Sequence, residues 1–167
     1  AALLAFIVHS SLATVLLISS LVAAGTVPLS LGLVLLLGAN LGGAIPPVMA
    51  TLASGTLARR VTLGNLVIKS IGVFCCLPFI GLLVEFVPQL GLHPSRIIID
   101  AHLAFNACLA ILFLPLVSAV AALVEKIIVE NEQDQNKTGV KYLDEELIGT
   151  PVLALSNASR EVLHMTE

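Results

Sequence analysis

The chain has 167 residues, of which 57% are hydrophobic and only 11% are charged, and its mean hydropathy is +1.04. An ordinary soluble domain has roughly 45–50% apolar and about 25% charged residues, so we expect most of this chain to lie in a lipid bilayer. Its net charge of −3, with eight Lys and Arg, argues against nucleic-acid binding, which needs a basic patch.

Four apolar segments make up the first 129 residues. They run from Ala1 to Gly25, from Pro28 to about Ser54, from about Val61 to Val87, and from about Ile97 to Val129. The first two are long enough to cross about 30 Å of hydrocarbon. We therefore expect an all-α, multi-pass membrane unit over residues 1–129. Because Ala1 lies in an apolar run without an initiator Met, we also expect the chain to be part of a longer protein.

A polar island, His9-Ser10-Ser11 with Thr14 nearby, interrupts the first segment. Irregular backbone at membrane depth is tolerated only where it is buried in protein or lines a cavity, so the island predicts a broken helix at a transport site. Its hydroxyls are oxygen ligands for Na⁺, and the exposed amides of a broken helix attract an anion. Alternatively, Ser and Thr here only hydrogen-bond across packed helices. The segment either crosses fully or re-enters as a hairpin on the outer side.

A second island runs from Gly38 to Gly43 and contains Asn40. Its glycines let the backbone unwind or let a neighbouring helix approach closely, and the spacing of Gly38 and Gly42 is also a helix-packing pattern. Pro46-Pro47 follows and removes two backbone donors. We expect Asn40 to coordinate or hydrogen-bond a ligand at this point.

Two further polar pairs lie four residues apart, and therefore on one helix face: Asn65 with Lys69, and His102 with Asn106. Intramembrane polar residues usually face the bundle interior, which makes both pairs candidate site residues. Alternatively, Lys69 snorkels to the cytoplasmic end and His102 sits at the outer interface. A solvated outer rim is expected from Glu85, His93, Arg96 and Asp100, and packing roles are expected for Cys75, Cys76 and Cys108.

The basic residues predict the topology. Arg59 and Arg60 lie between the second and third segments, which places that turn in the cytoplasm. The end of the fourth segment is then cytoplasmic too. A polar run begins at Glu130 and predicts a solvated linker over residues 130–149. Thr150-Pro151 resembles a helix start, so residues 150–167 are expected to begin a cytoplasmic helical domain.

These islands resemble the second repeat of the sodium/phosphate cotransporter family. The family has two inverted repeats, each with a Gln-Ser-Ser-Ser re-entrant motif followed by Gly-Ala-Asn-Ile/Leu-Gly-Thr-Thr. Here the corresponding stretches are His9-Ser10-Ser11-Leu12 and Gly38-Ala39-Asn40-Leu41-Gly42-Gly43-Ala44. Compared with these motifs, this chain lacks one amide and several hydroxyls. The tail from Tyr142, with Leu143-Asp144, resembles the opening of a PhoU-like domain.

The resemblance implies secondary active symport of inorganic phosphate or a related oxyanion across the plasma membrane, in bacteria the inner membrane. It implies sodium as the coupling ion, no other cofactor, and a first repeat in the same polypeptide as partner within the bilayer. Ser10, Ser11 and Asn40 are the candidate sodium ligands, and His9 is a candidate for proton coupling. The expected binding residues are His9, Ser10, Ser11, Thr14, Gly38, Asn40, Gly42, Asn65, Lys69, His102 and Asn106.

A second hypothesis is a transport-inactive membrane scaffold that presents its cytoplasmic helical domain to a partner. The missing hydroxyls favour it. An enzyme is not expected, because no nucleophile, base and orienting group stand at suitable spacing.

Overall fold

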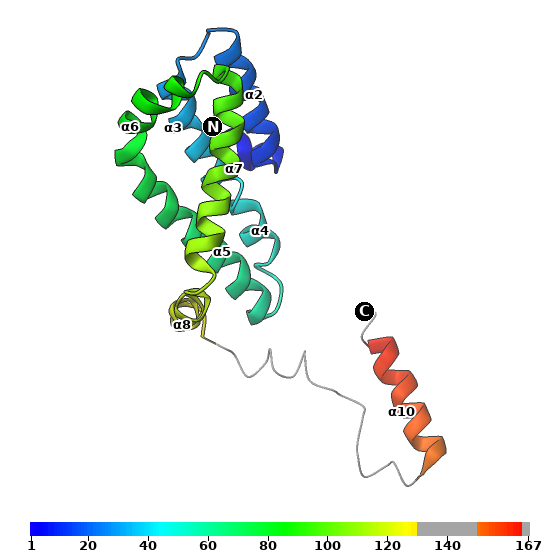
Figure 1. The fold of residues 1–167 in the computed structure, drawn as a ribbon. Coiled ribbons are helices and arrows are strands. Elements are labelled where there is room, and N and C mark those ends of the chain that lie inside the picture. The colour runs from blue at the N-terminus through cyan, green and yellow to red at the C-terminus, as the bar shows by residue number, and fades with distance from the viewer. Residues whose placement is uncertain (130–149, 165–167) are drawn as a thin grey trace. The chain divides into compact units, whose positions relative to one another are not determined.

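The computed structural model describes residues 1–129 and 150–164. The chain divides into two units, residues 1–129 and the chain from residue 130 onward (Figure 1). Within the described ranges the regular structure is entirely helical. The predicted linker over residues 130–149, the Tyr142 and Leu143-Asp144 part of the PhoU-like resemblance, and residues 165–167 lie outside the described residues.

The first unit contains eight α-helices and two short 3-10 helices within residues 1–129. They are α1 (Ala2–Val8), α2 (Ser11–Ala23), α3 (Leu29–Gly42), α4 (Ile45–Ala50), α5 (Thr56–Cys76), η1 (Leu77–Phe79), α6 (Ile80–Phe86), η2 (Val87–Leu90), α7 (Pro94–Phe113) and α8 (Val117–Ile127). The second unit contributes α10 (Pro151–His164).

The core of the first unit forms where α3 packs between α1, α2 and α7. Gly32 permits the close approach of three helices, because a Cβ added there would lie 2.7 Å from Val22 Cγ2 and 3.0 Å from Ile98 Cδ1. Leu36 and Ile98 are almost completely buried beside it. Bulky side chains on two helices thus fill the groove that a glycine leaves on the third.

Among the residues that the structure describes, three helical stretches are long and apolar enough to cross a membrane: Leu29–Ala50, Thr56–Gln89 and Pro94–Phe113. The helix α2 is apolar but shorter. These stretches match the second, third and fourth predicted segments in position, and they identify the unit as a membrane protein by length and composition.

The predicted fourth segment is wrong in its length. It was expected to continue to Val129, but α7 ends at Phe113 and α8 starts only at Val117. Pro115 stands between them, and proline both lacks an amide donor and disfavours a helical conformation at the residue before it. In Figure 1, α8 is seen nearly end-on beneath α7, so the chain turns sharply here.

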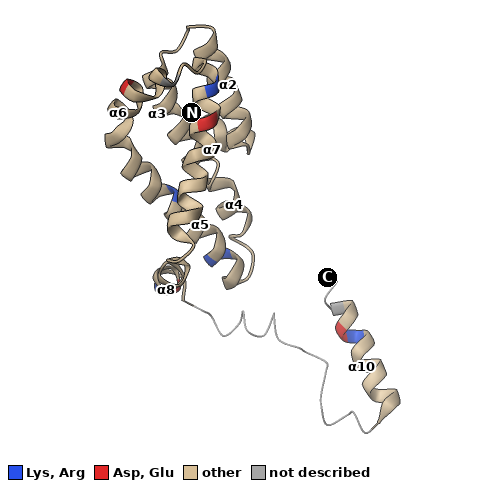
Figure 2. Cartoon of the chain, viewed as in Figure 1, with Lys and Arg blue, Asp and Glu red and all other residues tan. Residues whose placement is uncertain are grey.

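The helix α8 packs on the first turns of α5. Arg60 holds the two together, because its guanidinium donates to the Ile128 carbonyl at 3.1 and 3.2 Å and lies 3.7 Å from the Glu125 carboxylate. Charged residues otherwise gather at the two ends of this unit, with Lys69 as the exception along α5 (Figure 2). Such an arrangement suits a bundle whose middle lies in hydrocarbon.

The helix α10 begins at Pro151, as the Thr150-Pro151 pair predicts. The Thr150 carbonyl accepts the Ala154 amide at 3.0 Å, which closes the first turn. Val152, Leu155 and Val162 follow one another at three- or seven-residue steps on this helix, and all three are exposed within the described part of this unit.

Candidate functional site

A partly buried polar cluster joins α3 to α7. Asn40 on α3 is completely buried; its Nδ2 donates to the Leu36 carbonyl at 3.1 Å and lies 3.1 Å from His102 Nδ1. Asn106 Nδ2 donates to Asn40 Oδ1 at 3.0 Å and to the His102 carbonyl at 2.9 Å. We call Asn40, His102 and Asn106 the amide–imidazole cluster. It brings together three of the residues that the sequence nominates.

The Leu36 carbonyl sets the hydrogen-bonding roles in this cluster. A carbonyl oxygen only accepts, so the Asn40 atom that faces it is the amide nitrogen. That nitrogen also faces His102 Nδ1, which is therefore the accepting nitrogen of a neutral ring. The proton of His102 then resides on Nε2, which makes no hydrogen bond among the described residues. The cluster thus holds an imidazole N–H donor ready for an acceptor oxygen.

Lys69 adds a positive charge near this donor. It is half-buried on α5, a helix that contacts both α3 and α7. Within residues 1–129 and 150–164, the Lys69 ammonium has no hydrogen bond or ion pair. Asn65, which the sequence pairs with Lys69 because the two are four residues apart, is exposed on α5 and lies outside the cluster. Of that predicted pair, only Lys69 has a place beside the polar cluster.

The chain breaks at the first polar island. The helix α1 ends at Val8, His9 adopts a left-handed conformation with φ 55°, and α2 begins at Ser11. Ser10 is the N-cap, whose Oγ accepts from the Ala13 amide at 3.1 Å, while Thr14 Oγ1 donates to the Ser10 carbonyl at 3.1 Å. His9 is exposed, and its Nδ1 lies 3.1 Å from the Ile7 carbonyl oxygen. The break is therefore a tight turn between two helices.

Ser11 lies beside the second island. A Cβ added at Gly43 would lie 2.7 Å from Ser11 Cβ and 3.2 Å from Ser11 Oγ. Gly43 follows Asn40 by three residues, which is about one helical turn. The half-buried Ser11 hydroxyl makes no hydrogen bond among the described residues. Among the hydroxyls of Ser10, Ser11 and Thr14, it is therefore the one without a hydrogen bond to a described residue.

The glycines of the second island serve close approach and not unwinding. The helix α3 continues through Gly38 to Gly42 and turns only at Gly43 and Ala44. A Cβ at Gly38 would lie 3.6 Å from Ala1 Cβ, and one at Gly42 would collide with the Ala2 backbone carbonyl. The packing alternative for this pair therefore describes the structure, and the start of the chain lies directly on α3.

Sequence reasoning missed a second polar link to α7. Ser19, buried on α2, donates through Oγ to the Ser95 carbonyl at 3.0 Å. This bond fixes α2 against the first turn of α7, as the cluster fixes α3. One signal in the sequence could have predicted that Ser19 is buried. It follows Val15 by four residues and precedes Val22 by three, so the three residues share one helical face.

The chain is similar over nearly its whole length to curated bacterial proteins. It is 37% identical over 164 residues, 98% of this chain, to the "Putative inorganic phosphate export protein YjbB" of Escherichia coli K12 and to the protein of that name in Salmonella typhimurium. It is 33% identical over 122 residues, 73% of this chain, to the "Uncharacterized protein YqeW" of Bacillus subtilis. The name of the first two describes a transport protein.

The chain spans about 30% of the length of the two YjbB proteins and 40% of YqeW. No family model matches it. No solved structure matches it either.

Proposed function

We propose that this chain is one repeat of a membrane transporter that moves inorganic phosphate, or a related oxyanion, across the plasma membrane by alternating access. The amide–imidazole cluster is the single observation that carries the proposal, because polar and ionisable side chains within membrane-spanning helices are costly and usually serve a function. Support also comes from relatives that share 37% identity over 98% of this chain and are named for phosphate export.

The cluster offers the chemistry that an oxyanion needs. The His102 Nε2–H would donate to one phosphate oxygen, and the Lys69 ammonium would neutralise charge. Hydrogen bonds to ionised groups are roughly twice as strong as neutral ones. Asn40 and Asn106 would act as positioning residues, since their hydrogen bonds fix the imidazole ring. The other side of the site would come from the inverted repeat that the family resemblance implies.

Sodium is the proposed coupling ion. Ser11 lies beside Gly43, which follows Asn40 by about one helical turn, so the Ser11 hydroxyl, the Ser10 oxygens and Asn40 Oδ1 are the candidate ligands at the helix break. A symporter runs in the direction set by the summed gradients of both solutes, so the same site serves export when cytoplasmic phosphate is high. We further propose that α8 and the unit containing α10 lie in the cytoplasm, the latter as the start of a PhoU-like domain.

One observation favours the scaffold hypothesis. Asn40 uses both polar atoms within the protein, and the Ser10 and Thr14 hydroxyl groups are engaged inside α2. A degenerate site that only holds helices together would look like this. The scaffold would leave the Lys69 charge without a purpose, whereas an anion site needs it.

The test is the flux of labelled phosphate in proteoliposomes containing the full-length protein, measured in both directions with sodium or choline. The Lys69→Met variant removes the charge without removing any hydrogen bond between described residues, so it should fold. We expect its flux to fall roughly tenfold or more, which corresponds to about 1.4 kcal/mol. The double variant Ser10→Ala with Asn40→Ala should lose flux and sodium dependence.

Ser20→Ala is the matched control, because the exposed Ser20 hydroxyl bonds only the Leu16 carbonyl of its own helix. Its flux should equal that of the wild type. Wild-type protein that neither binds nor moves phosphate, yet retains a partner through its C-terminal unit, would establish the scaffold instead. Flux that is equal with sodium and choline would reject sodium coupling alone.

A further inference from the structure

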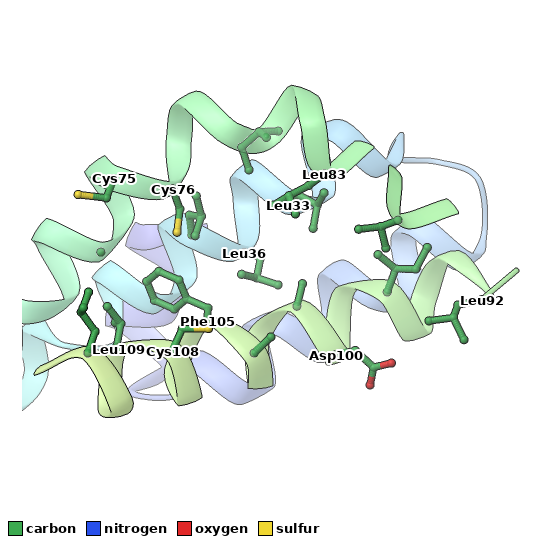
Figure 3. Close-up of a pocket in the computed structure, with 18 residues that line it drawn as sticks. Leu33, Leu36, Cys75, Cys76, Leu83, Leu92, Asp100, Phe105, Cys108 and Leu109 are labelled. Atoms are coloured by element: carbon green, nitrogen blue, oxygen red, sulfur yellow. The ribbon is translucent and has the colours of Figure 1, made fainter. Parts of the chain in front are cut away.

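An apolar cavity of about 550 Å³ lies between α3, the α5–α6 arm and α7 (Figure 3). Leu33, Leu36, Cys76, Phe105 and Cys108 are among its lining residues. Asp100 is the only carboxylate among the lining residues, and in Figure 3 it lies on α7 between Phe105 and Leu92 with its carboxylate turned away from the interior. The cavity therefore suits an apolar guest and offers a phosphate ion nothing.

Proline creates this space. Near the middle of the bundle α5 and α7 touch tightly, since a Cβ at Gly72 would lie 3.1 Å from Leu109 Cδ1. Beyond that contact Pro78 lies in the 3-10 turn η1, which joins α5 to α6. A proline without an amide bends the helix, and α6 leans away from α7 (Figure 1). The lining of the cavity runs from Gly72 and Leu109 toward α6 and the start of α7.

The cavity of about 550 Å³ is lined almost entirely by apolar side chains, so it has room for a slender apolar guest. Small-molecule pockets span about 300–1,000 Å³, a range that includes this cavity. An extended hydrocarbon chain is slender enough to occupy it.

We propose that the cavity binds one acyl chain of a zwitterionic phospholipid, drawn from the leaflet that surrounds α6 and the start of α7. At that end the wall of the cavity continues into exposed apolar surface, because Leu82 and Phe86 on α6 are 51% and 58% exposed. At the same end Arg96 Nε lies 3.3 Å from Asp100 Oδ2 on α7. A headgroup with a phosphate and an amine would meet one partner of each sign there.

Photolabelling tests this proposal on the full-length protein in nanodiscs. The probe is phosphatidylethanolamine with a diazirine in one acyl chain, and adducts are located by peptide mass spectrometry. We expect adducts on Cys108 and Leu36 inside the cavity, in addition to adducts on Leu103, which is 69% exposed outside it. Diazirine-bearing free fatty acid should label Leu103 but not the cavity residues.

Two neighbouring substitutions separate the cavity from the general lipid surface. Ala104 lines the cavity and Leu103 does not, so Ala104→Phe should reduce the Cys108 adduct at least about tenfold and Leu103→Phe should leave it unchanged. Leu83→Trp fills the space from the opposite wall and should act like Ala104→Phe. A Leu103 adduct that persists in both filled variants shows that they remain folded in the bilayer.

Three results would overturn the proposal: unlabelled cavity residues in the wild type, Cys108 labelling that both filling variants leave intact, or equal cavity labelling by the free fatty acid. A thiol cross-linker that joins Cys108 to a segment beyond residues 1–167 would likewise show that protein, and not lipid, fills the cavity.

Discussion

The two sides of the first unit are built differently. On the side of α1, α2 and α3, glycines bring backbones together and polar bonds join helices, as at Gly42 against Ala2, Ser19 to Ser95, and Asn40 to His102. On the side of α5 and α6, the polar contacts to other elements lie near the start of α5, at Arg60 and Thr62. Farther along, an arm bent near Pro78 leaves an apolar cavity. The same α7 borders both sides.

This difference separates two tasks that a transporter must combine. A binding site needs side chains whose positions are fixed by neighbouring bonds, and the polar-linked side supplies them. Movement needs packed elements that can shift at small cost, and an arm with few polar bonds to the core meets that need. Lys69 is carried by the bent arm, whereas the amide–imidazole cluster belongs to the fixed side.

The largest effect should come from filling a glycine contact on the fixed side. Gly42→Ala places a Cβ against the Ala2 backbone carbonyl, an obstacle that cannot rotate away, and should destabilise the protein by about 3 kcal/mol. Gly81→Ala on α6 meets nothing within 4 Å and should stabilise it by about 0.5–1 kcal/mol. The thermal unfolding of each full-length variant in detergent measures both. Changes of the same sign would contradict the contrast between the sides.

A smaller effect is expected from the cluster itself. Asn40→Ala leaves Asn106 and His102 without their partner and should cost about 2 kcal/mol of unfolding free energy. Asn65→Ala removes an exposed side chain and should change that energy by less than about 0.5 kcal/mol. The same thermal measurement distinguishes them. If Asn40→Ala and Asn65→Ala lowered the unfolding free energy equally, the hydrogen bonds of Asn40 would contribute no stability.

The smallest effect concerns the second polar link. Ser19→Ala removes the bond to the Ser95 carbonyl, and interhelical hydrogen bonds in membranes average about 0.6 kcal/mol. Ser20→Ala removes only a bond within α2 and serves as its neighbour control. Hydrogen exchange at the first turn of α7 should rise in Ser19→Ala alone. An unchanged exchange pattern would show that apolar contacts are enough to hold α2 on α7.

Several features of the fold could be predicted because they follow from local chemistry. Hydrophobic length gave the positions of three spans, and the polar island at His9-Ser10-Ser11 marked the place where α1 ends and α2 begins. The turn after Phe113 was also readable in principle, since Pro115 stands in an otherwise continuous apolar run. Apolar length alone hides such a turn, because a bent segment and a straight one have the same composition.

The relations between distant residues could not be read in this way. Asn40 and His102 are 62 positions apart, and their spacing in sequence says nothing about which helix faces which. Similarly, the glycines at 38 and 42 permit either an unwound backbone or a close neighbour. Only the arrival of Ala1 and Ala2 at that surface decides between the two.

Equilibrium binding of labelled phosphate to the purified full-length protein tests the central claim most directly. In sodium buffer, Lys69→Met should bind phosphate at least about tenfold more weakly than the wild type, while Ser20→Ala should bind with unchanged affinity. Equal affinity in Lys69→Met and the wild type would contradict the assignment of an oxyanion site to Lys69 and the amide–imidazole cluster.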